Sequence, residues 1–109
     1  MTTEAQFQRQ VTDLADIYGW RWLHVRKSVG RRNGSAAWQT TTNVKGWPDL
    51  LLWRSGRIVA AELKSATGKL SPEQNEVLGS LRAAGVDCYV WRPDDLEDVA
   101  ACLSSRVPA

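Results

Sequence analysis

The strongest constraint in this sequence is a pair of apolar segments, 48–53 and 57–64, which are separated by little more than Ser55-Gly56. Alternation of apolar and turn-forming residues of this kind predicts two antiparallel strands joined by a two-residue turn. Leucines stand on both faces of the first segment. A strand that is apolar on both faces must be covered on both, so we predict a central sheet with helices packed against it.

Further elements follow from helix caps and hydrophobic spacing. Thr3 with Gln6, and Ser71 with Gln74, have the spacing of a capping box, which marks the start of a helix. The predicted elements around the hairpin are a helix over 4–18, a strand over 20–25, a helix from Pro72 that ends at Gly85, a strand over 86–91 and a short helix that carries Leu96 and Leu103. A helical crossover makes the strands on either side of it parallel. The predicted fold class is therefore α/β, with a mixed central sheet of about four strands flanked by helices.

The chain has 109 residues, which is enough for one domain, and we predict a single domain over 1–109. The polar segment 26–46 has no clear period and is expected to be a long, partly mobile loop. The segment 104–109 is expected to be a loose tail. No apolar run approaches the roughly 20 residues that span a bilayer, and the N-terminus has no signal pattern. We therefore expect a cytoplasmic protein with no membrane partner.

Charge is distributed unevenly, although the net charge is only +2. No Asp or Glu lies between Ile17 and Pro48, whereas acidic residues gather near the C-terminus. Such asymmetry favours a surface that meets a polyanion, with a merely solvated basic surface as the alternative. The expected phosphate contacts are Arg26, Lys27, Arg31, Arg32 and Lys45. Trp38 lies in the same segment and is expected to stack on an unpaired base.

The remaining aromatic residues and the one histidine are assigned mainly to packing. Trp22, Trp53 and Trp91 lie on predicted strands and are expected in the core. Trp47 precedes the charged group described next and is expected to form a wall beside it. His24 is expected to be a packed residue, with a phosphate contact or a general base as the alternative.

The predicted hairpin brings three charged side chains together. With a two-residue turn, Arg54 faces Arg57, and the ladder continues until Asp49 lies opposite Glu62. Lys64 projects from the same face as Glu62, because side chains alternate along a strand. Two close carboxylates repel each other, and a divalent cation such as Mg²⁺ satisfies both. A purely structural acid pair bridged by a lysine is the alternative, and it would gain little stability in an apolar hairpin.

These residues also carry a family resemblance. The run Gly46-Trp47-Pro48-Asp49, followed by Glu62-Leu63-Lys64, resembles the signature of PD-(D/E)XK nucleases. The segment 46–99, with its helix start Leu70-Ser71-Pro72-Glu73-Gln74, resembles the VRR-NUC family of small nucleases. This resemblance implies a restriction-endonuclease-like core that hydrolyses DNA phosphodiester bonds with Mg²⁺, or with Mn²⁺ as a substitute.

The resemblance also implies roles for individual residues. Asp49, Glu62 and the backbone carbonyl of Leu63 would bind the metal, and Lys64 would assist the attacking water. Gln74 would reach the site by hydrogen bonding, with a purely capping role as the alternative. Glu4 is the candidate for a further acid on the first helix, and a first-turn Glu that favours the helix dipole is the alternative.

The leading functional hypothesis is thus a metal-dependent DNA endonuclease that acts on branched DNA, such as a Holliday junction or a flap, as a homodimer. A nicking or restriction-type nuclease with some sequence preference is one alternative. A DNA-binding module that keeps the fold and lacks catalysis is the other. The complete set of Asp49, Glu62 and Lys64 argues for the enzyme.

Overall fold

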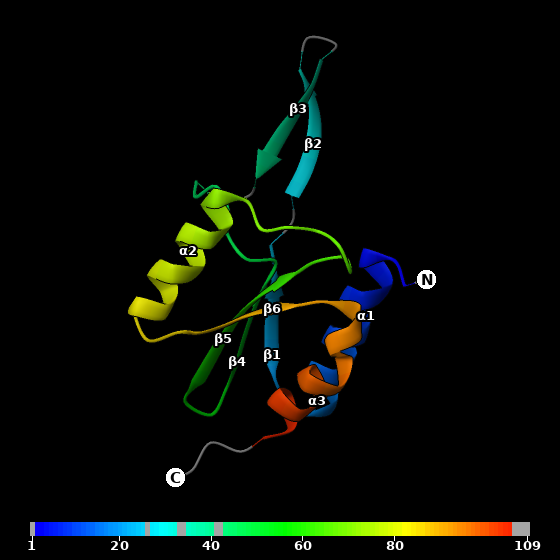
Figure 1. The fold of residues 1–109 in the computed structure, drawn as a ribbon, viewed down its shortest axis with the longest axis vertical. Helices are drawn as coiled ribbons and strands as arrows, with labels where there is room; N and C mark the ends of the chain where they lie inside the picture. Colours follow the sequence, from blue (N-terminus) through cyan, green and yellow to red (C-terminus); the bar gives the residue numbers. More distant parts are fainter. Residues whose placement is uncertain (1, 26, 33–34, 41–42, 106–109) are drawn as a thin grey trace.

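The structure is a computed structural model that describes residues 2–25, 27–32, 35–40 and 43–105, with 27–32 and 35–40 described by backbone only. The elements, in chain order, are α1 (Glu4–Ile17), β1 (Arg21–His24), β2 (Lys27–Arg32), β3 (Ser35–Thr40), β4 (Leu50–Arg54), β5 (Arg57–Leu63), α2 (Pro72–Ala83), β6 (Asp87–Trp91), a 3-10 helix (Pro93–Asp95) and α3 (Leu96–Ser104). Four of the strands form one mixed sheet in the order β1-β4-β5-β6 (Figure 1). This confirms the predicted α/β class.

The turn between β4 and β5 sets the register of the sheet. Ser55 and Gly56 both have positive φ, at 44° and 80°, as a two-residue type I′ turn requires. Arg54 consequently pairs with Arg57, and the antiparallel ladder continues to Leu50 opposite Ala61. The predicted pairing is therefore confirmed.

The second half of the sheet is built by a crossover. Ser71 accepts a hydrogen bond from Gln74 N at 3.1 Å and starts α2, with Pro72 at the first helical position. The chain then returns through β6, which pairs with β5 in parallel, as predicted. Thr3 and Gln6 form the other predicted capping box, at the start of α1.

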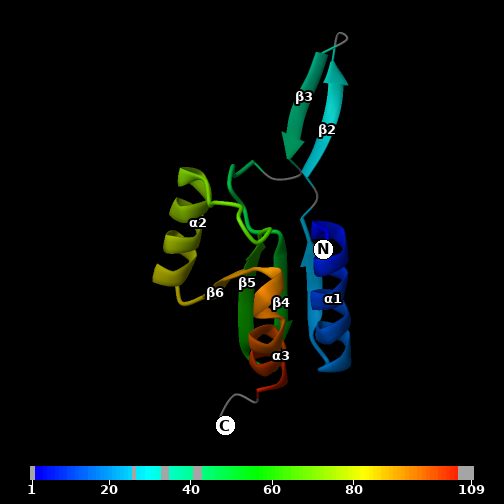
Figure 2. The same cartoon turned by 45° about the vertical axis from the view of Figure 1, so that its right-hand side comes forward.

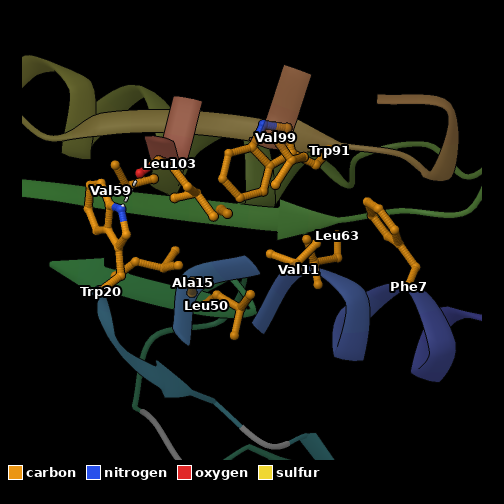
Figure 3. Close-up of a cluster of buried hydrophobic side chains, with 12 residues drawn as sticks. Phe7, Val11, Ala15, Trp20, Leu50, Val59, Leu63, Trp91, Val99 and Leu103 are labelled. Carbon is orange, nitrogen blue, oxygen red and sulfur yellow. Dashed lines mark hydrogen bonds between the residues drawn. The ribbon is translucent and has the colours of Figure 1, made fainter. Parts of the chain in front are cut away.

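The helices cover the sheet unequally (Figure 2). The main core lies between the sheet and the helices α1 and α3, where apolar residues from the sheet and from both helices interdigitate (Figure 3). Within this core the indole nitrogen of Trp20 donates a hydrogen bond of 2.7 Å to the carbonyl of Leu103, which ties α3 to the start of β1. Helix α2 lies on the opposite side of the sheet and buries Leu78 there.

Because α2 is the only helix on its side, the part of that sheet face farther from it stays open among the described residues. Trp53 lies there and is 39% exposed. Trp22, on the edge strand β1, is 37% exposed and its indole nitrogen donates to Asp16 Oδ1. The prediction that these two tryptophans belong to the core is wrong, whereas the same prediction for Trp91 is confirmed.

The segment 26–46 is not the single long loop that the sequence suggested. Its backbone contains β2 and β3, which pair antiparallel from Lys27 opposite Thr40 to Arg32 opposite Ser35. This ribbon projects from one end of the body (Figures 1 and 2). The signal for it was present, because Asn33-Gly34 is a favoured two-residue hairpin turn.

The predicted boundary of the C-terminal tail also needs correction. Ser104 is the last residue of α3, and Ser105 follows as its C-cap. Ser105 is held by a hydrogen bond from Arg54 to its carbonyl oxygen. Residues 106–109 of the predicted tail lie outside the described residues.

No helix within the described residues combines the length and the apolar character needed to cross a membrane.

Replacement of Leu52 tests which face of the sheet carries the core. Leu52 is fully buried, whereas Leu23 on the open face is 53% exposed. We expect Leu52→Ala to lower the free energy of unfolding by about 2–5 kcal/mol, because it leaves a cavity under α1 and α3. Leu23→Ala should cost less than about 1 kcal/mol in the same urea titration. Equal losses for the two variants would contradict this assignment of the core.

Candidate active site

The predicted meeting of Asp49 and Glu62 rests on the register of β4 and β5. The ladder ends with Leu50 opposite Ala61, so Asp49 directly precedes the paired part of β4, and Glu62 lies one residue beyond Ala61 on β5. Asp49 Oδ2 accepts a hydrogen bond of 2.8 Å from the backbone N–H of Leu63, the residue after Glu62. The Asp49 carboxylate is therefore held against the end of β5. Val25 N–H donates to the carbonyl oxygen of Asp49 at 2.9 Å, which fixes its backbone from the other side.

Glu62 is the most deeply buried acid of this group, with only 2% of the residue exposed. Its Oε1 accepts a hydrogen bond of 3.3 Å from Gln74 Nε2 and lies 4.0 Å from Lys64 Nζ. A buried carboxylate is costly unless donors and a positive charge accompany it. The amide and the ammonium supply both, and Lys64 itself keeps only 16% of its side chain exposed.

Gln74 makes a hydrogen bond of each kind that the sequence left open, one to the helix cap and one to Glu62. Its Oε1 accepts a hydrogen bond of 2.9 Å from the backbone N–H of Ser71 and completes the capping box. The Ser71 N–H can only donate, so the amide oxygen must face it, and the amide nitrogen is then directed to Glu62. The start of α2 and the buried acid are thereby linked through a single side chain.

Gly46 allows the segment before Asp49 to reach α2. Its φ is +89°, and a Cβ at this position would lie 2.6 Å from the carbonyl carbon of Glu73 and 2.8 Å from the nitrogen of Gln74. Only glycine permits both this backbone conformation and this approach. The contact was not predicted, because the sequence does not reveal which backbone lies against Gly46.

Lys45, an expected phosphate contact, lies beside the same helix start. Its Nζ is 3.4 Å from Glu73 Oε1, and 82% of its side chain is exposed. A hydrogen bond from the backbone N–H of Glu73 and the charge of Lys45 hold the pKa of the Glu73 carboxyl below its usual value. This exposed pair leaves the lysine on the surface beside Glu73, the residue before Gln74.

The structure also gives the positions of Glu4, His24 and Trp47, three further residues singled out in the sequence. Glu4 is exposed in the first turn of α1. Among the described residues, no three His, Cys, Asp or Glu side chains are grouped closely enough to hold a metal ion, so Glu4 does not form such a trio with Asp49 and Glu62. His24 pairs with Leu50 in the sheet and is half-buried, and Trp47 is half-buried immediately before Pro48.

The expected DNA contacts fall mostly on the β2–β3 hairpin. Arg26 lies outside the described residues. For Lys27, Arg31, Arg32 and Trp38 the structure gives the backbone positions within β2 and β3, and their roles stay predictions.

The donor atoms of the central group suit a hard divalent cation. Two carboxylates and the nearby Leu63 carbonyl are oxygen ligands, which Mg²⁺ prefers. Mg²⁺ commonly uses one or two protein carboxylates and keeps several waters. Two acids are therefore enough to bind it, although the described residues offer no group of three. The residues thus fit a magnesium ion, with Lys64 as an adjacent positive charge.

Comparison with known proteins gives a match to a nuclease family. The family model of the VRR-NUC domain matches residues 23–95, which include Asp49, Glu62, Lys64 and Gln74. No significant match is found among curated proteins or among solved structures.

The requirement for glycine at position 46 can be tested against a matched position. Gly19 also has positive φ, at +78°, but no atom lies within 4 Å of a Cβ built there. We expect Gly19→Ala to cost about 1–2 kcal/mol, the usual penalty for this backbone conformation. Gly46→Ala adds the clash with α2 and should cost more than that in urea denaturation. Equal losses for the two variants would show that α2 does not need this close approach.

Proposed function

The chain belongs to the VRR-NUC family and has a nuclease-type domain, and on this premise we propose that it is a Mg²⁺-dependent DNA endonuclease selective for branched DNA. The observation that carries the proposal is the buried Glu62 carboxylate, with Lys64 Nζ 4.0 Å away and Asp49 held at the end of the same strand. A structural role explains this arrangement poorly, because burying an acid and a lysine together gains little stability.

We propose that Asp49, Glu62 and the Leu63 carbonyl hold the metal ion. When bound, Mg²⁺ offsets the negative charge that builds on the phosphate and makes water a better nucleophile. Lys64 orients the attacking water and stabilises the developing charge on the phosphate oxygens. Gln74 keeps the Glu62 carboxylate in place through its hydrogen bond to Oε1. Glu4 is proposed as an outer acid that assists the site through water.

The chemical step is then the hydrolysis of one phosphodiester bond. Water attacks phosphorus, the bond from phosphorus to one ester oxygen breaks, and the products are a phosphate monoester and an alcohol. The low exposure of Lys64 and Glu62 limits competing solvent around their charged atoms, which strengthens their electrostatic effect.

The β2–β3 hairpin is the proposed DNA arm. Its base adjoins the candidate site, because Val25, which lies two residues before β2, donates to the Asp49 carbonyl. The segment carries Lys27, Arg31 and Arg32 without any acidic residue. A two-stranded ribbon fits the major groove of DNA, which is about 12 Å wide. The contacts expected from the arm are with phosphates, which carry no sequence information, so we propose a junction or flap as substrate, bound by a homodimer.

Cleavage assays with a supercoiled plasmid and a four-way junction test the activity. We expect cutting that requires Mg²⁺ or Mn²⁺, is abolished by EDTA, and falls about 10²–10³-fold in Asp49→Asn and Glu62→Gln, because the charged metal ligands are removed. Glu97→Gln on α3 removes a carboxylate away from the site and should cut like the wild type. Binding without cutting in any divalent metal would indicate the alternative, a DNA-binding module. Faster cutting of a particular duplex sequence than of the junction would indicate a restriction-type enzyme.

The DNA arm makes a separate prediction about salt dependence. We expect Arg31→Ala/Arg32→Ala to weaken binding to every junction sequence, and to flatten the slope of log K against log salt by about 0.9 for each phosphate that the protein no longer neutralises. Fluorescence anisotropy over a salt series measures both effects. Arg9→Ala/Arg82→Ala removes the same charge from the helices and should leave the slope unchanged. An equal change in both variants would mean that net charge, and not the hairpin, determines binding.

A further inference from the structure

The segment from Lys64 to Leu70 connects the end of β5 to the cap of α2 without regular secondary structure. A single guanidinium nitrogen anchors it. Arg92 Nη1 donates to the carbonyl oxygen of Ser65 at 2.7 Å and to that of Gly68 at 2.6 Å. Ser65 Oγ accepts a further hydrogen bond of 3.0 Å from Gly68 N, which closes the turn between the two carbonyls. One arginine therefore fixes both ends of this turn.

The last residue of β6, which directly precedes Arg92, binds the backbone of Lys64. The backbone N–H of Lys64 donates to the carbonyl oxygen of Trp91 at 2.9 Å, which extends the parallel ladder by one step. Lys64 is thus bracketed by two consecutive residues: Trp91 binds its backbone nitrogen, and Arg92 binds the carbonyl of the residue that follows it. This arrangement restricts the backbone rotations that would carry the Lys64 side chain away from Glu62.

Arg92 is itself oriented by its neighbours. Its backbone N–H donates to Asp95 Oδ2 at 2.8 Å at the start of the 3-10 helix. Nη1 carries two hydrogens, and each is donated to a different carbonyl oxygen. Because the guanidinium is planar and rigid, the directions of these two hydrogens are fixed relative to each other. A lysine has a flexible stem and cannot hold the two carbonyls in the same fixed geometry.

We propose that Arg92 is a positioning residue that acts through Lys64: by fixing the Ser65–Gly68 turn, it keeps the Lys64 ammonium beside Glu62. This inference rests on the proposed nuclease function and assigns to Arg92 no contact with the reacting atoms. The expected kinetic signature is a change in kcat, because the ammonium acts on the transition state, with little change in the KM for DNA.

The test compares Arg92→Ala and Arg92→Lys with a matched control, Arg54→Ala. Arg54 Nη1 also bridges two carbonyls, those of Tyr18 and Leu103 at 2.9 Å each, but at the opposite end of β4 and β5. We expect both Arg92 variants to lower kcat about 10- to 100-fold on a Mg²⁺-activated junction substrate, since small misplacements of a catalytic group have this size of effect. KM should change by less than about twofold, and Arg54→Ala should lose stability without this loss of kcat.

Two further measurements separate positioning from a general loss of structure. When Arg92→Ala is added to Lys64→Ala, kcat should fall by a further factor of less than about two. The reason is that the Lys64 ammonium, through which Arg92 acts, is already absent. In metal-free protein, the amides of 65–70 should exchange hydrogen faster in both Arg92 variants than in Arg54→Ala.

The outcomes distinguish this inference from the proposed function. If the wild type cuts DNA and the Arg92 variants cut at the same rate, or if the losses from Lys64→Ala and Arg92→Ala multiply, the positioning role is overturned and the nuclease assignment stands. If the wild type cuts no substrate in Mg²⁺ or Mn²⁺, the proposed function fails. In that case hydrogen exchange alone tests whether Arg92 fixes the turn. Unchanged exchange of the amides of 65–70 in the Arg92 variants would overturn this structural role too.

Discussion

The arrangement of the whole site depends on the two-residue turn between β4 and β5. Ser55 and Gly56 both adopt positive φ, so the turn has one geometry and the strands have one register. Side chains alternate between the faces of a strand, and a slip of one residue would move each of them to the opposite face. Such a slip would place Glu62 among the apolar residues under α1 and α3, and would move Ala61 and Val59, which are now fully buried, out of that core. The same burial that stabilises the sheet therefore also fixes the acids of the candidate site.

Local chemistry made part of this structure predictable from the sequence. The register follows from turn length, and the start of α2 follows from Ser71 and Gln74, so the group of Asp49, Glu62 and Lys64 could be predicted without any long-range information. The hairpin β2–β3 was missed because the favourable signal of Asn33-Gly34 is flanked by strands without a clear apolar alternation. The exposure of Trp53 could not be predicted, because it depends on how many helices cover one sheet face. The role of Arg92 was hidden for a similar reason, since its acceptors lie 24 and 27 residues away in the sequence.

Glu62 is a position in the sheet where burial of a charged group costs stability. The residue lies between Ala61 and Leu63, which are buried in the sheet, and it introduces a carboxylate where an apolar side chain would pack at no electrostatic cost. Its donors come from two directions, Lys64 on its own strand and Gln74 on α2. Because Gln74 also caps α2, loss of the helix start would remove a donor from Glu62 as well. The cap, the buried acid and the close approach of Gly46 thus depend on one another.

Arginines that bind backbone carbonyls hold the two ends of the sheet in the same chemical manner. At the turn end, Arg54 binds the carbonyls of Tyr18 and Leu103 and stacks over Trp20 at 4.7 Å. This arrangement joins the ends of α1 and α3 at the end of β5 opposite Lys64. At the other end, Arg92 binds carbonyls in the turn that follows Lys64. Carbonyls in such connecting segments have no ladder partner, and a guanidinium satisfies two of them with one side chain. The same solution is therefore purely structural at one end of β5, and at the other end it restrains the backbone that carries the lysine nearest to the buried acid.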